Sequence, residues 1–396
     1  MAKEEKQLSK GIGNNVITLG IVSFFTDISS EMIFPLIPVF LTTILGAGKE
    51  VLGLIEGIAD STASLVEIIS GYFSDKTGKR KQLVLFGYGI SSFVKLGIAL
   101  SNQWWQVLIM RGLERIGKGV RTAPRDAIIA DSADVKVRGK AYGLHRMMDT
   151  LGAIIGPAIA YLLLSWYGQA EPGYRAVFFA ALIPAFLAVL VVIFFVREPE
   201  KVQQPAQKTQ FWESLKQMPA AYKTYLKISL FFSLAYFSFA FFIVRANDLG
   251  ISAENILLLY LIYNIVYAAA AIPTGMLSDK IGRKPVIAGA FALYAIVCLG
   301  FVFAGSWLQL ALLFAAYGIF VAADESVNKA YIIDISAVER RGMALGAYNT
   351  AIGAAYLPAS IIAGVLWTMY GPLAPLSLAA GIALIAAAAL MFCCKE

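Results

Sequence analysis

Long apolar segments separated by short polar loops run through this chain, and this alternation decides what it can fold into. A helix needs about 20 predominantly apolar residues to cross the hydrocarbon core of a bilayer. Segments of that kind occur at 16–44, 51–74, 82–100, 104–128, 140–167, 174–196, 224–246, 254–278, 285–304, 306–331, 342–370 and 374–394. The sequence therefore predicts an all-α membrane protein with about twelve transmembrane helices.

The composition agrees with a membrane protein and argues against a soluble globule. Hydrophobic residues make up 59% of the 396 residues and charged residues only 15%, whereas a soluble domain carries about 25% charged residues. Helices that pack inside lipid need small residues where they touch, and the 34 glycines supply them. The lipid bilayer is therefore an expected partner.

One long polar interruption divides the apolar segments into two sets of six. It covers residues 197–222 and is rich in Gln, Pro and charged residues. We therefore predict an N-terminal six-helix bundle at 1–196, a cytoplasmic linker at 197–222 and a C-terminal six-helix bundle at 223–396.

The formal net charge of +7 is distributed along the chain in a pattern typical of membrane topology. Lys and Arg gather in alternate loops, such as 76–81, 136–140, 280–284 and 340–341, and the loops between them hold few. The positive-inside rule places the basic loops, and with them both termini, in the cytoplasm. We therefore expect a multi-pass protein of the cytoplasmic membrane and no nucleic-acid partner.

An internal repeat connects the two sets of segments. GYFSDKTGKRK begins at Gly71 and GMLSDKIGRKP begins at Gly275, 204 residues later. A second feature repeats at an offset of 203, because Asp131 and Asp334 each precede an Arg-Gly pair by seven residues. Parallel repeats of this kind build transporters, with the ligand site expected near the bilayer midplane where the repeats meet.

The repeated loop resembles the signature of the major facilitator superfamily, Gly-x-x-x-Asp-(Arg/Lys)-x-Gly-(Arg/Lys)-(Arg/Lys). The matching residues are Gly71, Asp75, Lys76, Gly78, Lys79 and Arg80, then Gly275, Asp279, Lys280, Gly282, Arg283 and Lys284. The resemblance covers essentially the whole chain. It implies a fold of two six-helix halves, transport by alternating access and no cofactor.

The resemblance also implies a conformational latch made by these cytoplasmic loops. Asp75 would contact the chain near Arg341, and the residues of the second echo, Asp131, Arg138 and Asp334, belong to the same set. The first glycine of each loop would allow a neighbouring helix to approach, and the second would allow a tight turn. The alternative is that these are only basic turn residues that follow the positive-inside rule.

The fifth segment contains Gly152-Ala-Ile-Ile-Gly156-Pro157, which is similar to the core of a motif found in the superfamily's antiporters. Ala160 and Tyr161 stand where two further glycines often follow, so the match is incomplete. The alternative is ordinary close helix packing with a proline kink.

Several ionisable residues fall inside the apolar segments, where each is a functional candidate because an unpaired charge in lipid is costly. The proton-coupling candidates are the carboxylates Asp27, Glu31, Asp60 and Asp149. A proton carrier needs a carboxyl group whose proton affinity burial raises and a nearby cation lowers. Permanent structural ion pairs are the alternative reading.

The candidates for lining a substrate cavity differ in kind between the two halves. The first half offers the cations Arg111, Arg115 and Arg121, and the second half offers Tyr236, Tyr260, Tyr263, Asn264, Tyr267, Tyr348 and Asn349. Aromatic rings with a polar tip suit an amphipathic organic ligand or a cation, although ordinary core aromatics are the alternative. In the repeat alignment Asp324 falls opposite Arg121, and this reversal of sign predicts a salt link between the halves.

The sequence predicts no enzyme and no metal site, because it lacks an HExxH motif, a nucleophile beside a base, and a cluster of Cys and His. We predict a monomeric, proton-coupled secondary transporter that exports a small organic compound by antiport. The main alternative is a facilitator or symporter for a charged metabolite, a metal chelate or a lipid, with the arginines as an anion clamp. A non-transporting membrane receptor is a third possibility.

Overall fold

The computed structural model describes residues 11, 13–134, 137–198, 217–337 and 340–393. Residue contacts divide the chain into two compact units. The first unit comprises Met1–Leu36 and Leu65–Gln207, and the second comprises Ile37–Ser64 and Lys208–Glu396. Most of the predicted linker, 199–216, lies outside the described residues, and the predicted domain boundaries stay a prediction.

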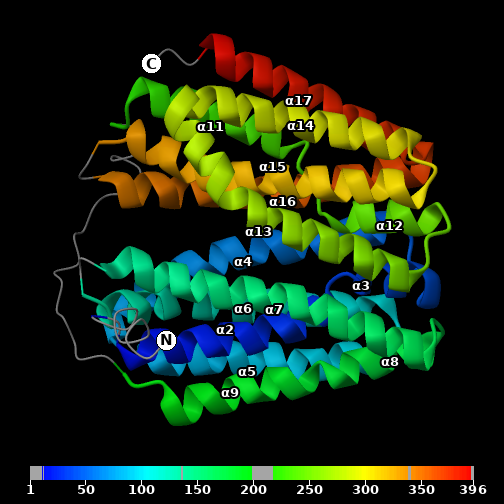
Figure 1. The fold of residues 1–396 in the computed structure, drawn as a ribbon, viewed down its shortest axis with the longest axis horizontal. Helices are drawn as coiled ribbons and strands as arrows, with labels where there is room; N and C mark the ends of the chain where they lie inside the picture. The colour runs from blue at the N-terminus through cyan, green and yellow to red at the C-terminus, as the bar shows by residue number, and fades with distance from the viewer. Residues whose placement is uncertain (1–10, 12, 135–136, 199–216, 338–339, 394–396) are drawn as a thin grey trace. The chain divides into compact units, whose positions relative to one another are not determined.

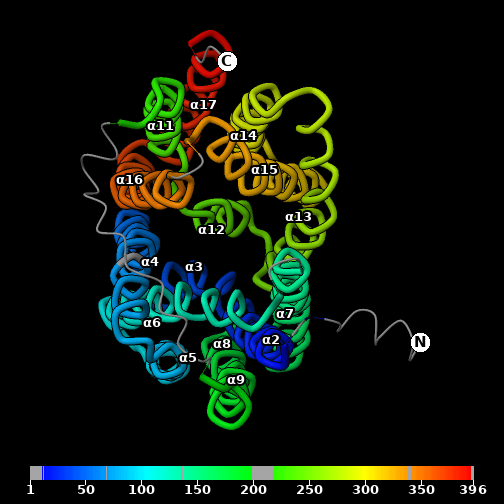
Figure 2. Tube along the Cα trace, turned by 90° about the vertical axis from the view of Figure 1, so that its left-hand side faces the viewer, coloured from blue at the N-terminus to red at the C-terminus, as the bar shows by residue number. Residues whose placement is uncertain are grey.

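The first unit is a bundle of long helices that lie side by side (Figures 1 and 2). Its elements are α2 (Asn14–Ile33), the later part of α4 (Lys49–Thr77), α5 (Arg80–Ala99), α6 (Trp104–Asp131), α7 (Arg138–Tyr167), α8 (Glu171–Ala180) and α9 (Leu182–Phe195). The main helix pairs are α5 with α6 and α2 with α7, and α9 packs on α2 and α5. Gly87 and Gly117 lie at the α5–α6 contact, where a Cβ at either position would come within 2.8 Å of the other's carbonyl oxygen.

The second unit is also helical. Its elements are α3 (Ile37–Val39), the π-helix η1 (Phe40–Ile44), the first part of α4, α11 (Ala220–Ser233), α12 (Ala240–Asp248), α13 (Ala253–Ile281), α14 (Arg283–Phe303), α15 (Trp307–Asp334), α16 (Arg341–Tyr370) and α17 (Leu373–Cys393). In this unit α13 packs on α15, α14 lies against α15 and α17, and α11 contacts α16 and α17. The short helix α3 packs on α12.

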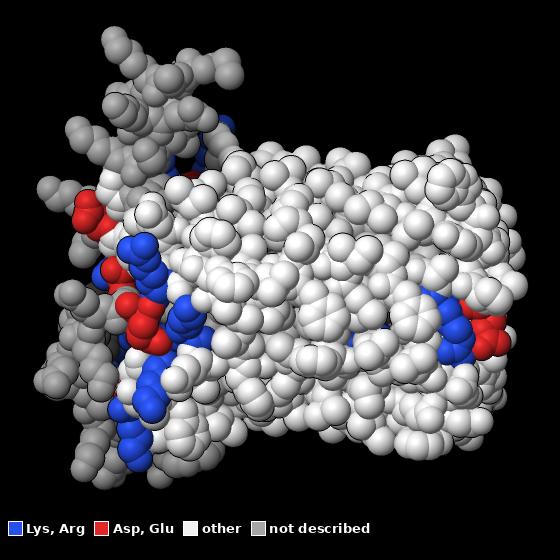
Figure 3. All heavy atoms as spheres, turned by 90° about the horizontal axis from the view of Figure 1, so that it is seen from below, with Lys and Arg blue, Asp and Glu red and all other residues white. Residues whose placement is uncertain are grey.

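The surface agrees with a protein that spans a membrane. In the described part of the chain, nine helical stretches are long and apolar enough to cross a bilayer. On the face shown in Figure 3, charged side chains gather toward the two ends and leave the middle to uncharged residues. The predicted all-α membrane fold is therefore confirmed, whereas the count of twelve transmembrane helices stays a prediction.

The predicted segment 224–246 is not one helix, because the structure breaks it between α11 and α12 at residues 234–239. Side chains from other helices bond to the backbone there: the Tyr294 hydroxyl donates to the Ala235 carbonyl (2.8 Å), and the Ser360 hydroxyl accepts from the Ser238 amide (3.1 Å). The predicted segment 174–196 is divided at Ala181 into α8 and α9. Pro184 contributes to this break, because a proline has no amide hydrogen for the helical hydrogen bond.

Candidate functional site

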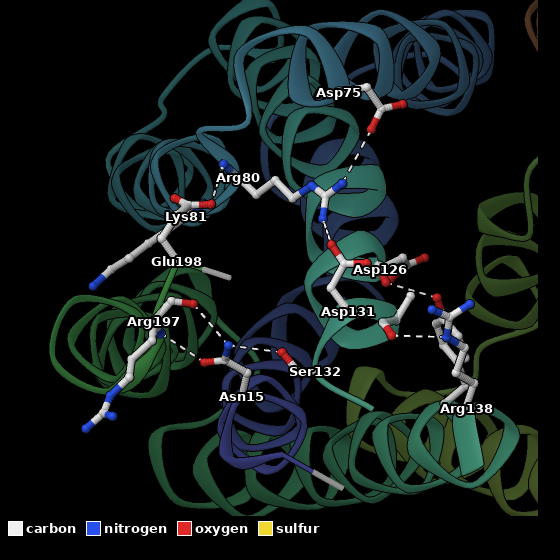
Figure 4. A network of polar contacts seen from close by, with 12 residues as sticks. Asn15, Asp75, Arg80, Lys81, Asp126, Asp131, Ser132, Arg138, Arg197 and Glu198 are labelled. Atoms are coloured by element: carbon white, nitrogen blue, oxygen red, sulfur yellow. Dashed lines mark hydrogen bonds and ion pairs between the residues drawn. The ribbon is translucent and has the colours of Figure 1, made fainter. Parts of the chain in front are cut away.

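A network of ion pairs holds the loop between α4 and α5 against the end of α6 (Figure 4). The Arg80 guanidinium forms an ion pair with Asp131, at the end of α6, and a longer one of 3.6 Å with Asp75. Arg138, at the start of α7, donates from Nε to the Ala130 carbonyl at 3.1 Å. The first copy of the repeated loop thus connects the ends of three helices.

The second unit builds the same arrangement from the second copy of the loop. Arg283 pairs with Asp279 at 2.5 Å and with Asp334 at 3.2 Å, and its Nη1 also donates to the Ser278 hydroxyl at 2.6 Å. Arg80 and Arg283 are 203 residues apart, as are Asp131 and Asp334. The sequence repeat is therefore also a repeat of ion-pair geometry. Arg341 lies exposed at the start of α16, and its predicted contact with Asp75 stays a prediction.

The glycines of the two loops have different surroundings. Gly78 and Gly282 take positive φ angles of 66° and 94°, a backbone conformation that favours glycine. A Cβ on Gly71 would lie 3.4 Å from the Ala123 side chain, so α6 approaches closely there. At Gly275 the described structure has no atom within 4 Å of a Cβ, so close approach of a helix explains the first glycine of one loop only.

Two residues that sequence reasoning missed support this network (Figure 4). The Glu198 carboxylate accepts hydrogen bonds from the backbone amides of Arg80 and Lys81, both at 2.9 Å, and so caps the start of α5. The Asn15 side chain donates to the Ser132 hydroxyl (3.1 Å) and to the Arg197 carbonyl (3.0 Å). Each partner lies over a hundred residues away, so no local sequence pattern could have identified these contacts.

Two of the predicted proton-coupling carboxylates meet inside the first unit. The carboxyl groups of Asp27 on α2 and Asp149 on α7 lie close enough to interact directly. The charge of Glu31, four residues further along α2, also acts on Asp27. Arg146 contributes an ion pair to Asp149 at 3.2 Å. The structure therefore gathers three of the four candidates at the α2–α7 contact.

The glycines of the fifth segment bring the backbones of α2 and α7 together beside these carboxylates. A Cβ on Gly152 would lie 2.5 Å from the Phe24 carbonyl oxygen and 3.0 Å from the Asp27 Cβ. A Cβ on Gly156 would lie 2.6 Å from the Ile28 carbonyl oxygen and 3.0 Å from the Glu31 Cβ. Pro157 is buried within α7. The motif thus places the α7 backbone directly against both acids of α2.

The three candidate arginines of α6 have different partners. Arg111 is 2% exposed, pairs with Glu114 at 2.5 Å and lies 5.6 Å from the centre of the Phe34 ring. Arg121 is also buried, and its described contacts are with neutral groups: it donates to the Ser91 hydroxyl at 2.5 Å and lies 4.6 Å from the centre of the Tyr88 ring. Arg115 is partly buried on the same helix.

Lys95 on α5 is a buried cation that was not among the candidate residues predicted from the sequence. It is 2% exposed, and its Nζ donates to the hydroxyls of Ser29 (2.6 Å) and Ser30 (3.2 Å) on α2. The signal was present in the sequence, because Lys95 is a lone charge inside the apolar segment 82–100. The interior of the first unit therefore holds a cation that is bonded to Ser29 and Ser30, which lie between Asp27 and Glu31 on α2.

Asp60, the fourth carboxylate, belongs to the part of α4 that packs against α16 in the second unit. Nearby, the Ser61 hydroxyl donates to the Gly353 carbonyl at 2.7 Å. A Cβ on Gly57 would lie 3.0 Å from the Leu357 carbonyl oxygen, and Gly53 meets the Ser360 carbonyl even more closely. Small residues thus let the two helices touch backbone to backbone, and we call this contact the α4–α16 seam.

Polar pairs close the seam at the start of α4. Lys49 forms an ion pair of 3.1 Å with Asp248, at the end of α12. The Glu50 carboxylate accepts a hydrogen bond from the Thr368 hydroxyl, near the end of α16. The basic loops lie at the opposite ends of both helices, after Thr77 and before Arg341. The seam therefore runs from the ends of α4 and α16 that are remote from the basic loops to about the middle of both helices.

Most of the predicted aromatic residues gather in one cluster of the second unit. Tyr263 on α13 lies 4.9 Å from Phe239 and 5.6 Å from Tyr317, measured between ring centres. The Tyr236 hydroxyl, in the break between α11 and α12, is 3.3 Å from that of Tyr317. Tyr260 is 5.5 Å from Tyr263. The predicted residues Tyr260 and Tyr263 of α13 therefore pack against Phe239 in the break and, for Tyr263, against α15.

The remaining predicted residues lie around this cluster or apart from it. Tyr267 donates to the Glu325 carboxylate at 2.7 Å, and Asn264 is buried. The Tyr348 ring on α16 stacks on Tyr225, with 6.0 Å between ring centres. Asn349, the residue after Tyr348 on α16, is exposed.

Comparison with known proteins identifies the family of this scaffold. The family model of the Major Facilitator Superfamily matches residues 19–245 and again 230–395. The chain belongs to the major facilitator superfamily. The resemblance seen in the repeated loops is thereby confirmed, and the repeated ion pairs are features of a member of this superfamily.

Relatives and solved structures agree with membership of the superfamily. An uncharacterized MFS-type transporter of Methanocaldococcus jannaschii is 41% identical over 371 residues, which are 92% of this chain and 90% of the relative. The multidrug resistance protein MdtG of Proteus mirabilis is 28% identical over 67% of each chain. The crystal structure of the nucleoside transporter NupG (D323A mutant) superposes with a TM-score of 0.81 at 13% identity, covering 96% of this chain and all of that one.

Membership of the superfamily establishes the general activity. The chain is a multi-pass membrane transporter and not an enzyme, and it binds small-molecule substrates within the membrane. Transporters of the superfamily need no cofactor. Among the described residues, no group of three or more His, Cys, Asp or Glu side chains is arranged to hold a metal ion.

Proposed function

We propose that this chain is a proton-coupled antiporter that exports a small organic compound across the cytoplasmic membrane by alternating access. The observation that carries the proposal is the contact between the carboxyl groups of Asp27 and Asp149. Two carboxyl groups can hydrogen-bond only when one of them holds a proton, because two carboxylate anions repel each other. Such a pair inside a membrane protein is suited to take up and release a proton.

The surroundings of the pair support its role in coupling. Glu31 offers a second acceptor on the same face of α2, and Arg146 can stabilise the ionised state of Asp149. The glycine motif of α7 keeps the two helices in contact, so a shift of one helix against the other would change the distance between the carboxyls. The relatives named multidrug resistance protein support an organic substrate and the direction of export.

The alternative is a facilitator or symporter for a charged metabolite, a metal chelate or a lipid. Arg121 favours it, because this buried cation is held by neutral groups and could attract an anion. Arg111 weakens it, because its guanidinium is already paired with Glu114. A clamp of three arginines therefore loses one member, and we keep this function as the second candidate.

The proposal includes a topology of twelve transmembrane helices, with both termini in the cytoplasm, and a monomeric transporter. The basic loops support the orientation. Two units of similar helix content support alternating access by movement of one against the other.

The test uses the purified protein in sealed liposomes that contain a pH-sensitive dye. An inward proton gradient is imposed, and cationic, zwitterionic, neutral and anionic organic compounds are added in turn. We expect at least one compound to drive proton movement with the parent protein. The variants Asp27→Asn and Asp149→Asn should abolish that movement, because an amide cannot release a proton.

Two further variants show whether the effect belongs to this pair. Glu31→Gln should reduce proton movement, because it removes the neighbouring acceptor. Glu171→Gln is the matched control, since Glu171 is an exposed acid of the same unit that pairs with Arg175 at 2.6 Å. Flux that needs no gradient and is unchanged in the Asp27 and Asp149 variants would reject proton coupling at this pair and favour the facilitator.

A further inference from the structure

Asp324 on α15 is a carboxylate inside the second unit whose described partner is neutral. Its Oδ1 accepts a hydrogen bond of 2.6 Å from the side-chain amide of Asn328. Among the described residues, the side chain of Asp324 forms no ion pair, and Lys329, an exposed residue of the same helix, is the base whose charge acts on it. A carboxylate kept in a membrane helix without a paired cation is costly, so a functional reason is expected.

The internal repeat shows that the fold itself does not require an acid at this position. Asp324 follows Arg121 by 203 residues, the same offset that relates Arg80 to Arg283. In the first unit the equivalent position holds a buried cation that is bound by Ser91 and lies over Tyr88. The two equivalent positions carry opposite charges, which indicates that Asp324 has a role that is specific to the second unit.

Tyrosines from three parts of the chain lie near Asp324. Asn328, which holds the carboxylate, also accepts from the Tyr225 hydroxyl (2.6 Å) and donates to that of Tyr348 (3.3 Å). Tyr236 and Tyr356 are 5.6 Å apart between ring centres, and both lie close enough to Asp324 for its charge to act on their hydroxyls. The carboxylate is therefore set among rings from α11, α16 and the α11–α12 break.

These tyrosines are partly exposed and lie near negatively charged carboxylates. Tyr236, Tyr348 and Tyr356 are each only partly buried, so part of each residue remains accessible. The charges of Asp324, Glu325 and Asp60 all act at the Tyr356 hydroxyl. Accessible aromatic faces next to negative charge attract cations through the ring quadrupole and the Coulomb interaction.

The break in the helix adds a second feature typical of a substrate site. Transporters often form their sites where a membrane helix is interrupted. Here Tyr236 lies within the interruption at 234–239, which bonds from Tyr294 and Ser360 hold in place. The ring is thus presented from an irregular but fixed backbone.

We propose that Asp324, together with Tyr236, Tyr348 and Tyr356, binds the positively charged group of an organic cation. This inference rests on the proposed function only in taking the substrate to be an organic compound. The carboxylate supplies the counter-charge, and the rings cover the apolar substituents around it. Ammonium and phosphonium ions with aromatic substituents fit this chemistry, whereas carboxylates and phosphates would be repelled.

The first experiment measures equilibrium binding of radiolabelled tetraphenylphosphonium to the full-length protein in detergent, with protein-free micelles as the blank. Tetraphenylborate, which has the same shape and the opposite charge, is measured in parallel. We expect saturable binding of the cation and none of the anion. Absence of saturable cation binding, or equal binding of both ions, would overturn the proposal.

Variants assign the binding to this site. Asp324→Asn should weaken cation binding by about tenfold or more, because the counter-charge is lost while the hydrogen-bonding shape is kept. Asp324→Glu should retain most of the affinity. Glu325→Gln is the matched control, because it removes a neighbouring carboxylate that instead accepts from Tyr267, and it should change the affinity by less than about threefold.

The rings give a test that does not depend on the folding of the Asp324→Asn variant. Tyr236→Phe should keep cation binding, and Tyr236→Leu should lose most of it, because only the first retains the aromatic face. Equal affinities in these two variants, or an unchanged affinity in Asp324→Asn, would reject the site. The proposed function fails separately: cation binding that depends on Asp324, without transport in liposomes, would refute the transport mechanism and leave the site standing.

Discussion

At the scale of single residues, each repeated loop contains a glycine that adopts a positive φ angle and an arginine that is long enough to bind an acid on the next helix. Gly78 and Gly282 occupy the same place in the two copies and both have positive φ. Arg80 and Arg283 follow each of them by one or two residues and bind the acid at the end of the next helix. The turn positions the arginine, so the two residue types depend on each other.

The turn glycines yield a first prediction. Gly78→Ala and Gly282→Ala should each destabilise the protein by about 1–2 kcal/mol, because an L-residue is strained at positive φ. Thermal unfolding of the purified protein measures the effect. Gly275→Ala is the control within the same motif, since the described structure leaves space there, and it should leave the unfolding temperature unchanged or slightly higher. Equal losses in all three would contradict the explanation.

Lys95 yields a second prediction, in which stability and transport separate. Lys95→Met keeps most of the side-chain volume and removes a buried charge whose described bonds are to neutral serine hydroxyls, so the replacement breaks no described ion pair. We therefore expect an unfolding temperature within a few degrees of the parent and a transport rate lowered by about tenfold or more. Ser30→Ala, which removes only the longer of the two bonds to Lys95, should have little effect on either. Transport at the parent rate in Lys95→Met would make this lysine a packing residue.

At the scale of helices, two features position the residues that we assign to function: the close packing of α7 on α2, and the break between α11 and α12. Gly152 and Gly156 press α7 against α2 next to Asp27 and Glu31. The interruption between α11 and α12 presents Tyr236. In each unit an irregular or close-packed part of a helix thus coincides with the residues we assign to coupling or to substrate.

The third prediction concerns the contact between α2 and α7. Gly152→Ala and Gly156→Ala should each cost about 1–3 kcal/mol, because the added methyl group would overlap a carbonyl oxygen of α2. Gly143→Ala on the same helix has open space and serves as the control. Thermal unfolding distinguishes them. If both motif variants unfold at the same temperature as the control, the close contact does not exist in solution.

Much of this architecture could be predicted from the sequence. Helices that cross a bilayer need long apolar segments, and the internal repeat can be found by comparing the two halves of the sequence. The apolar helices, the duplicated loop and the repeated positions of Asp131 and Asp334 were recognisable, but the pairing of these acids with Arg80 and Arg283 was not predicted. The breaks at 181 and 234–239 were not, since the second depends on side chains from residues 294 and 360. Glu198 and Asn15 escaped notice for the same reason, because their partners are distant in sequence. Lys95 was readable as a lone charge and was overlooked.

At the scale of the whole molecule, the α4–α16 seam joins helices of the two predicted six-helix halves, so transport must open it if those halves move against each other. It joins residues 49–64 to residues 353–368 of α16 through small residues and a few polar bonds. The ion pair of Lys49 with Asp248 is only partly buried, so water weakens it. Such a contact can hold one state without making it permanent.

The fourth prediction is that locking this contact stops transport. Lys49→Cys and Asp248→Cys are introduced after Cys298, Cys393 and Cys394 have been replaced by alanine, and the pair is joined with a short thiol cross-linker. We expect transport in liposomes to stop and to recover when a cleavable linker is reduced. Each single-cysteine variant treated with the same reagent is the control. Full transport by the cross-linked protein would show that the seam does not need to open.

The seam also has a consequence for which positions of the chain tolerate mutation. Where two helix backbones touch, as at Gly53, Gly57 and Gly364, any side chain is excluded only while the helices are together. Selection for transport activity, applied to a library of random variants, would therefore spare these three codons if the joined state is visited in every cycle. A glycine that tolerated replacement there would belong to a conformation that the working protein seldom visits. Mutational tolerance along α4 and α16 would thus report the occupancy of one conformation in living cells.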